Sequence, residues 1–336
     1  MRIAYFYNEE WEKEYVAKRF PDDIFNFIKG TTKENTTLHD PDVVVLSVFV
    51  NSPVGADVLD RFPNLKFIVT RSTGYDHIDL SECAKRGIGI SNVPTYGEHT
   101  VAEFAMALLL ALSRRIVDAY SRIETTGSFS QEGLRGFDLK GRTIGIVGTG
   151  HIGEHMIRMA RGFDMNVIAF DVYQKTDLAA QLGFRYVSLD ELLAASDVIS
   201  LHAPYNEHTH HMINMDNIGK IKRGCYFINT SRGGLVDTMA LVKGLKDGIL
   251  AGAGLDVLEE EGGMVDENML LAAPHPSEES LRTVLANHYL IDHPHVIVTA
   301  HIAFNTQEAI ERILNVTIDN FAAYKNNAPI NMVKTA

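Results

Sequence analysis

The sequence predicts an α/β protein with two domains, each built on a doubly wound parallel sheet. The chain has 336 residues, which suffices for two domains of about 150 residues each. Short apolar runs rich in Val, Ile and Phe alternate with amphipathic stretches along the chain. Continuous apolar runs are typical of parallel strands buried on both faces, and their alternation with helical patterns indicates βαβ units.

A first series of strands lies in the N-terminal third. The expected strands are Ile3–Tyr7, Val43–Phe49, Phe67–Arg71 and Ile88–Val93. Amphipathic stretches between them predict helices, for example Ala56–Phe62 and Leu80–Arg86. The series therefore predicts one parallel sheet with helices packed on it.

A second series begins near residue 143. Its strands are expected at residues 143–148, 166–171, 197–202, 225–231, 251–257 and 295–301. Helical patterns such as Leu189–Ala195 and Met239–Lys246 separate most of these strands. A long apolar helix, Glu98–Ser113, is expected to join the two domains, and the chain ends in a helical pattern, Gln307–Tyr324.

A glycine pattern follows the first strand of the second series. Gly148, Gly150 and Gly153 form G-x-G-x-x-G, and an amphipathic helix, Ile152–Gly162, follows. Such glycines permit a tight turn, close approach of a pyrophosphate and close packing of helix on strand. The helix N-terminus adds unpaired N–H groups and the positive end of its dipole. The pattern therefore predicts a Rossmann-like dinucleotide site.

An acidic residue completes this pattern. The next strand ends in Asp171, 21 residues after Gly150 (171 − 150). A carboxylate there accepts hydrogen bonds from the adenosine ribose and repels a 2′-phosphate, which favours NAD over NADP. A simple turn residue is the alternative interpretation, but the strand–glycine–helix context favours the cofactor.

Three polar residues follow later strands. Arg232 lies in NTSRGGLVD, Glu261 ends the acidic run of GLDVLEEE, and His301 lies in VTAHIAFNT. Each alone has a structural interpretation, but the carboxyl ends of parallel strands are where α/β proteins bind ligands. Hydride transfer to a keto acid requires a group that binds the carboxylate, a proton donor, and a carboxylate that orients the donor. Arg, His and Glu are suited to these tasks.

These motifs together resemble the D-2-hydroxyacid dehydrogenase family. The resemblance rests on GTGHIG, Asp171, LHAPYNEHTHHMI, NTSRGGLVD, GLDVLEEE and TAHIAFNT, and on TRSTGYDHIDL and NVPTYGEHTVAE in the first third. It implies a substrate domain of residues 1–98 and 299–336, an NAD-binding domain of residues 99–298, and an active site in an inter-domain cleft. It also implies a homodimer that pairs through the cofactor domain.

Residue by residue, the resemblance implies a catalytic set of Arg232, Glu261 and His301. Arg232 would bind the substrate carboxylate as a bidentate pair. His301 would act as the acid in reduction and as the base in oxidation. Glu261 would orient His301, because the family pattern D-V-x-E-x-E places this partner five residues after Asp256; Glu260 is the alternative.

The resemblance also implies residues around the substrate and the cofactor. The backbone N–H groups of Thr73 and Gly74 would share the carboxylate, and Tyr96 and Phe49 would line the pocket. Phe304 matches an aromatic residue near the substrate methyl group, which favours pyruvate. The implied NAD-binding residues are Gly148, Gly150, His151, Ile152, Gly153, Asp171, Ala203, Pro204, Thr209, Thr230, Ser231 and Asp256.

Two alternatives stay open. Hydroxypyruvate, glyoxylate or a branched keto acid would be reduced by the same chemistry as pyruvate. Some relatives with this fold and catalytic set instead act as NAD-sensing transcriptional corepressors. The intact catalytic set favours the enzyme, an NAD-dependent dehydrogenase that forms D-lactate from pyruvate.

Composition disfavours other classes of partner. The net charge of −12 argues against nucleic acid, because phosphate binding requires clustered Lys and Arg. No apolar stretch is long enough to span a bilayer, and the early acidic residues argue against a signal peptide. Two distant cysteines, Cys83 and Cys225, fit a reducing cytoplasm. No metal site is expected at His208, His210 and His211, since no further ligand lies at a suitable spacing.

Overall fold

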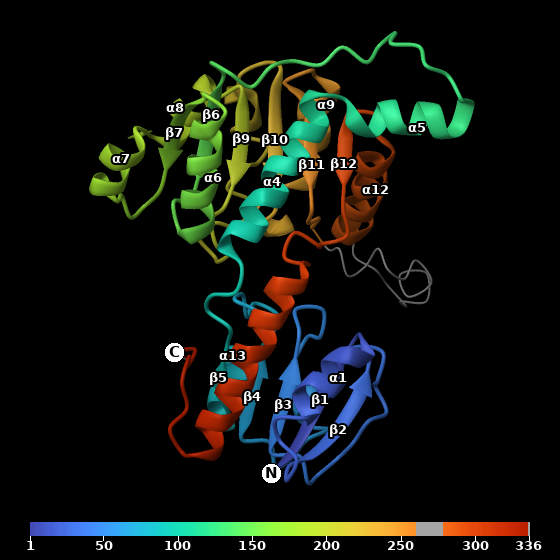
Figure 1. Cartoon of the computed structure of the whole chain (residues 1–336), viewed down its shortest axis with the longest axis vertical. Coiled ribbons are helices and arrows are strands. Elements are labelled where there is room, and N and C mark those ends of the chain that lie inside the picture. The colour runs from blue at the N-terminus through green and yellow to red at the C-terminus, as the bar shows by residue number, and fades with distance from the viewer. Residues whose placement is uncertain (260–277, 335–336) are drawn as a thin grey trace. The chain divides into compact units, whose positions relative to one another are not determined.

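The computed structural model describes residues 1–259 and 278–334, and these form two compact units (Figure 1). Unit 1 is Met1–Gly97 with Asn305–Ala336, and unit 2 is Glu98–Phe304. Each unit contains one sheet in which all strand pairs are parallel. The predicted α/β class with two doubly wound parallel sheets is confirmed.

Unit 1 has a five-stranded sheet in the order β2-β1-β3-β4-β5. Its strands are β1 (Arg2–Tyr7), β2 (Ile24–Lys29), β3 (Val45–Val48), β4 (Phe67–Thr70) and β5 (Gly89–Ser91). Alternate side chains of these strands enter two separate cores. Helices α1 (Glu10–Ala17) and α13 (Gln307–Lys325) cover one core, whereas α2 (Ala56–Leu59) and α3 (Leu80–Lys85) cover the other.

Strand β2 is absent from the strands that the apolar pattern predicts. Its sequence, IFNFIK, contains Asn26 and Lys29, and Ile24 is 62% exposed. The strand lies at the edge of the sheet beside β1. Edge strands need not be buried on both faces, so the continuous apolar run that marks a central parallel strand is missing here.

Unit 2 has a seven-stranded sheet in the order β12-β11-β10-β9-β6-β7-β8. The strands are β6 (Thr143–Val147), β7 (Asn166–Phe170), β8 (Arg185–Tyr186), β9 (Val198–Leu201), β10 (Cys225–Asn229), β11 (Leu250–Leu255) and β12 (Val296–Val298). On one face pack α4 (Glu98–Ser113) and α6 (His151–Gly162). On the other pack α8 (Leu189–Ala195), α9 (Thr238–Lys246) and α12 (Glu278–Asp292).

Two further helices lie in the described part of unit 2. Helix α7 (Thr176–Leu182) connects β7 to β8, and α5 (Ile116–Thr126) follows α4 and extends away from the sheet (Figure 1). Helix α4 is apolar and largely buried, as the sequence predicts. No helix within the described ranges is both long and apolar enough to cross a bilayer.

The parallel sheet of unit 2 brings the predicted site residues to one edge. The glycine loop follows β6, Asp171 follows β7, Ala203 follows β9 and Arg232 follows β10. Strand β12 is shorter than predicted and ends at Val298, so a turn separates it from His301. The predicted catalytic Glu261 and its alternative Glu260 lie outside the described residues.

Candidate active site

The glycine loop between β6 and α6 leaves space at the helix N-terminus. Gly148 has a φ of +92°, and a Cβ there would lie 2.7 Å from the amide nitrogen of Ala203. A Cβ on Gly153 would lie 2.0 Å from the carbonyl oxygen of Gly148. At Gly150, by contrast, no described atom outside its chain neighbours lies within 4 Å of the Cβ position. Gly148 and Gly153 are thus required by packing, whereas Gly150 opens the space that a pyrophosphate needs.

The Asp171 carboxylate accepts hydrogen bonds from this loop. Its Oδ2 accepts hydrogen bonds from the backbone N–H of Thr149 at 2.6 Å and from the Thr149 hydroxyl at 2.9 Å. Its Oδ1 accepts one from the N–H of Tyr173 at 2.9 Å. Burial alone would raise the pKa of Asp171, but these hydrogen bonds and nearby Lys175 outweigh it and lower the pKa. The carboxylate is therefore charged and fixed beside the loop.

The segment after β9 borders the same loop. His202 is buried, and its Nε2 lies 2.9 Å from the Ser200 hydroxyl. Burial lowers the pKa of His202 to about 4, so its ring is neutral at physiological pH. Beyond Ala203, the hydroxyl of Thr209 donates to the carbonyl of Pro204 at 2.7 Å and closes a short loop. The predicted cofactor residues Ala203, Pro204 and Thr209 therefore lie on or beside a loop that this hydrogen bond closes.

Arg232 lies on a turn that its own neighbours hold. Asn229, the last residue of β10, donates from its side chain to the carbonyl of Arg232 at 2.9 Å and accepts from the N–H of Ser231 at 3.0 Å. The Ser231 hydroxyl donates to the carbonyl of Leu201 at 2.8 Å. The Arg232 guanidinium donates to the carbonyl of Ser231 at 2.8 Å. Thr230, which lies between Asn229 and Ser231 in the sequence, is buried.

The same turn is packed against the chain that leaves β11. A Cβ on Gly233 would lie 2.1 Å from the carbonyl carbon of Leu258, so only glycine permits this approach. The carbonyl of Gly234 accepts from the N–H of His211 at 2.9 Å. The His211 side chain in turn lies 2.5 Å from Glu259, Nε2 to Oε1. Glu259 and His211 thus connect the two segments.

No sequence pattern predicts the pairing of Glu259 with His211. Glu259 is the first of three consecutive glutamates, and its Oε2 also accepts from the Thr238 hydroxyl at 2.9 Å. His211 belongs to the histidine cluster considered above as a metal site. Its φ of +48° and its contact with Glu259 indicate a structural role. Glu261 and Glu260 are not described, so their pairing with His301 stays a prediction.

Asp256 holds the turn that carries His301. The carboxylate is completely buried, and such a group requires hydrogen-bond partners. Its Oδ1 accepts from the Thr299 hydroxyl at 2.6 Å and from the N–H of Ile302 at 2.9 Å, and its Oδ2 from the N–H of Ala303 at 2.8 Å. The backbone N–H of His301 donates to the carbonyl of Asp256 at 2.9 Å. These contacts fix the His301 backbone, which has a φ of +52°.

In unit 1, Thr73 and Gly74 lie on the loop after β4. The carbonyl of Thr73 accepts from the Asn92 side chain at 2.8 Å, and that of Gly74 from the Ser72 hydroxyl at 2.6 Å. The Thr73 hydroxyl donates to the carbonyl of Val93 at 2.8 Å. With the carbonyls held by unit 1 and no described acceptor for the two N–H groups, the loop can present these donors to an anion.

The predicted aromatic residues are half-buried. Phe49 directly follows β3, and its carbonyl accepts from the N–H of Ser52 at 2.9 Å. Tyr96 precedes α4, and its carbonyl accepts from the Arg312 guanidinium of α13. Phe304 is the last residue of unit 2.

The chain is similar to known proteins over nearly its whole length. Residues 106–303 match the family profile described as D-isomer specific 2-hydroxyacid dehydrogenase, NAD binding domain. A "2-hydroxyacid dehydrogenase homolog" of Zymomonas mobilis is 39% identical over 319 residues, 93% of each chain. A glyoxylate reductase of Korarchaeum cryptofilum is 36% identical over 297 residues, 87% of this chain and 83% of that one. The crystal structure of Aquifex aeolicus D-lactate dehydrogenase complexed with NAD and lactic acid is similar with a TM-score of 0.85 and 34% identity, over 97% of this chain and 96% of that one.

Proposed function

The chain belongs to the D-isomer specific 2-hydroxyacid dehydrogenase family, and we propose that its preferred reaction is the reduction of pyruvate by NADH to D-lactate. It is an NAD-dependent oxidoreductase that acts on the CH–OH group of 2-hydroxy acids. The observation that carries the choice of substrate is the similarity over nearly the whole chain to a lactate dehydrogenase that was crystallised with lactic acid. The aromatic Phe304, three residues after His301, is consistent with a small apolar substituent on the substrate.

The geometry of the glycine loop supports its proposed role in NAD binding. The open space at Gly150 and the first N–H groups of α6, at His151 and Ile152, suit a pyrophosphate. The charged Asp171 carboxylate suits a ribose hydroxyl. Further residues of this proposed site are Gly148, Gly153, Ala203, Pro204, Thr209, Thr230, Ser231 and Asp256. When bound, NADH supplies the hydride that reduces the keto carbon.

Two side chains would act on the substrate itself, and a third would orient one of them. The Arg232 guanidinium pairs with the pyruvate carboxylate through two parallel hydrogen bonds, and the N–H groups of Thr73 and Gly74 add further donors. His301, protonated before the step, donates a proton to the keto oxygen as negative charge develops there. Glu261, which lies outside the described residues, would accept a hydrogen bond from the His301 ring and orient it. One hydride and one proton thus convert pyruvate to lactate.

A second candidate substrate is glyoxylate. The glyoxylate reductase of K. cryptofilum covers most of this chain at an identity similar to that of the lactate dehydrogenase. Glyoxylate lacks the methyl group of pyruvate, so an apolar contact to that group favours pyruvate. A hydrophobic pocket gains about 10- to 200-fold per methyl or methylene group. We therefore expect kcat/KM for pyruvate to exceed that for glyoxylate by at least about tenfold.

Initial rates of NADH oxidation with pyruvate, glyoxylate and hydroxypyruvate test this order. His301→Ala is expected to lower kcat with pyruvate by about 100- to 10,000-fold, because the proton donor is lost, while the Kd for NADH stays within about twofold. His39→Ala, a change at an exposed histidine of unit 1, serves as the matched control. Glyoxylate or hydroxypyruvate as the better substrate would refute the pyruvate assignment, and full activity of His301→Ala would refute the proposed chemistry.

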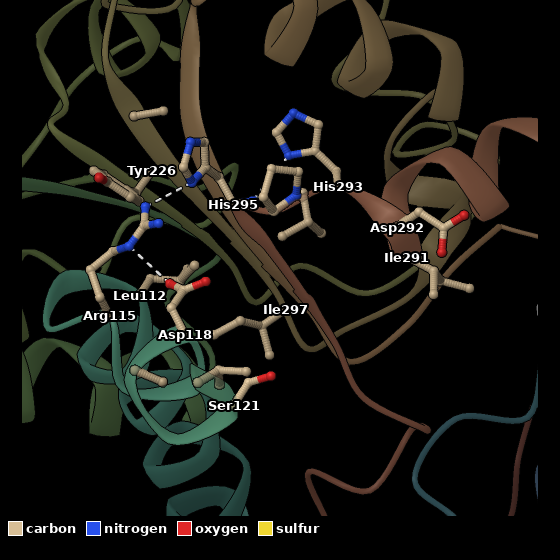
Figure 2. A pocket seen from close by; sticks show the side chains of 15 residues that line it. Leu112, Arg115, Asp118, Ser121, Tyr226, Ile291, Asp292, His293, His295 and Ile297 are labelled. Atoms are coloured by element: carbon tan, nitrogen blue, oxygen red, sulfur yellow. Dashed lines mark hydrogen bonds and ion pairs between the residues drawn. The ribbon is translucent and has the colours of Figure 1, made fainter. Parts of the chain in front are cut away.

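We also propose that the protein is a homodimer paired through unit 2. Helix α5 has no buried residue, and its apolar residues Ile116, Val117, Tyr120 and Ile123 are 54%, 49%, 65% and 45% exposed. This spacing forms one apolar stripe. Next to it lies a pocket of about 230 Å³ between α5 and the segment before and within β12 (Figure 2). An exposed apolar helix beside a pocket on the same unit suits a second copy of this chain.

Tyr120→Glu tests the homodimer, because it places a charge at the middle of the stripe. We expect a shift from dimer to monomer in sedimentation or light scattering, whereas Thr37→Glu, at an exposed position of unit 1, leaves the mass unchanged. A monomeric native protein would contradict the proposal.

The two cysteines are buried and free, which supports a further proposal, a reducing cytoplasmic location.

A further inference from the structure

A short chain of hydrogen bonds runs from the edge of the sheet in unit 2 to the Asp171 carboxylate. The backbone N–H of Lys175 donates to the Tyr186 hydroxyl at 3.0 Å. The Tyr186 hydroxyl lies 2.8 Å from the hydroxyl of Thr149. Thr149, the residue between the first two glycines of the loop, donates to Asp171 Oδ2 at 2.9 Å. Four residues from three segments, the loop after β6, the loop after β7 and strand β8, thus meet beside the glycine loop.

The direction of each hydrogen bond follows from the donors available. Asp171 is ionised, since hydrogen bonds from Thr149 and Tyr173 outweigh burial and lower its pKa, so its oxygens only accept. The single hydroxyl hydrogen of Thr149 is then committed to Asp171. Tyr186 must therefore donate to Thr149, and its own oxygen accepts from the N–H of Lys175. Every hydrogen bond in this network therefore has one donor and one acceptor.

This network holds one oxygen of the carboxylate and leaves an acceptor position on the other. Oδ2 receives both the backbone N–H and the hydroxyl of Thr149, whereas among the described residues Oδ1 receives the N–H of Tyr173 alone. Each carboxylate oxygen can accept about two hydrogen bonds. Oδ1 therefore keeps a free acceptor position, and the bonds to Oδ2 prevent the carboxylate from rotating.

The Tyr186 ring is held independently of its hydroxyl. Tyr186 lies on β8 opposite Ala169 of β7, two residues before Asp171. Its ring contacts that of Phe184 edge-to-face at 5.2 Å between centroids and packs against the core of unit 2. Removal of the hydroxyl alone should therefore leave the ring in place.

We propose that Tyr186, acting through Thr149, is a positioning residue that fixes the Asp171 carboxylate for the adenosine ribose of NADH and so sets the preference for NADH over NADPH. The inference rests on the proposed role of Asp171. A fixed carboxylate offers Oδ1 to the ribose hydroxyls without reorganisation, and it cannot turn away from a 2′-phosphate. Preorganisation of this kind raises affinity because fewer rotations are lost on binding.

Titrations of the intact protein with NADH and with NADPH, followed by nucleotide fluorescence, test the proposal without any substrate. Tyr186→Phe removes one hydroxyl, and Thr149→Val removes the other while it keeps the backbone N–H. Each is expected to raise the Kd for NADH about two- to tenfold, the range for one lost hydrogen bond. The Kd for NADPH divided by the Kd for NADH is expected to fall. Tyr15→Phe, which removes a tyrosine hydrogen bond to Asn315 in unit 1, is the matched control.

A double-mutant cycle separates positioning from a general structural effect. If Tyr186 acts through Asp171, Tyr186→Phe has no further effect on the Kd for NADH once Asp171→Ala is present. Equal weakening by Tyr186→Phe in both backgrounds would overturn the proposal, as would an unchanged Kd in both single variants of the network. An unchanged Kd in Asp171→Ala alone would instead overturn the proposed role of Asp171 itself. Should Tyr186→Phe lower the melting temperature, Thr149→Val repeats the cycle.

Discussion

Replacement of His202 by glutamine is expected to remove much of the acid sensitivity of unit 2. His202 follows β9, is only 8% exposed, and contacts Ser200 through Nε2. Burial lowers its pKa from an ordinary 6.5 to about 4. The folded protein therefore keeps this ring neutral at a pH where the unfolded chain binds a proton. Glutamine cannot bind that proton in either state.

The size and the direction of the effect follow from proton linkage. The difference in pKa between the two states corresponds to roughly 3 kcal/mol, at 1.36 kcal/mol for each pH unit. Because the folded pKa is the lower one, this stability is complete above pH 6.5 and is lost as the pH falls toward 4. Between pH 6.5 and 5, the wild type should lose about 2 kcal/mol more than His202→Gln.

Other titrating groups do not mask this difference. The pKa values of Asp171 and Asp197 are lowered, because hydrogen bonds outweigh burial, so their contributions are lost only below the ordinary carboxyl value of 3.8. Burial and the neighbouring His295 lower the pKa of His293 as well. His293 is present in both proteins, so its contribution cancels in the comparison.

The two buried cysteines allow each unit to be followed separately. Cys225 lies in a core of unit 2 and Cys83 in a core of unit 1, and they are the only cysteines in the chain. Labelling with a pyridyl disulfide across a urea series, read by mass spectrometry of the two peptides, gives an unfolding midpoint for each unit. The Cys225 midpoint should fall more steeply with acid in the wild type than in His202→Gln. Parallel pH profiles at Cys225, or an equal change at Cys83, would show that His202 does not set the acid sensitivity of unit 2.

Three further substitutions test the loops that carry the site. Gly150→Ala should weaken NADH binding at least about tenfold without lowering the melting temperature, because its Cβ meets no described atom within 4 Å. Gly153→Ala should lower both the affinity for NADH and the melting temperature, because its Cβ would lie 2.0 Å from a backbone oxygen. Calorimetry of the apoprotein and an NADH titration compare the two variants. Arg232→Lys keeps the charge but loses the bidentate geometry, so kcat/KM for pyruvate should fall by about a hundredfold with little change in NADH affinity; an unchanged kcat/KM would exclude Arg232 as the carboxylate ligand. Gly233→Ala should displace the Arg232 turn, since its Cβ would lie 2.1 Å from the Leu258 carbonyl carbon, and should lower kcat/KM at least about tenfold; Gly219→Ala, which meets no described atom within 4 Å, is the control and should be neutral in the same assay.

Much of the fold was predictable because unit 2 is built from local patterns. The glycine loop, its strand and Asp171 lie within one βαβ segment, so spacing alone relates them. Strand β2 lacked such a signal, since an edge strand need not be apolar on both faces. The strand predicted at residues 295–301 is longer than β12, because the apolar run that includes Val298 continues beyond the strand into a turn.

Contacts between distant segments were not predictable from the sequence. The sequence predicts Asp256 as an NAD-binding residue, and it gives no sign that the buried carboxylate also binds the N–H groups and the hydroxyl of the turn after β12. A buried acid at a strand end must find such partners, yet the sequence does not say which. The pairing of Glu259 with His211 across 48 residues is a second case. Both contacts arise because neighbouring parallel strands bring remote loops to one edge.

We propose that this chain reduces pyruvate with NADH and forms the D isomer of lactate. Chiral analysis of the product from purified protein, pyruvate and NADH tests this proposal, with NADH absorbance recorded in the same sample. We expect D-lactate, formed with one NADH consumed for each lactate. Formation of L-lactate, or no consumption of NADH by protein that binds it, would overturn the proposed reaction.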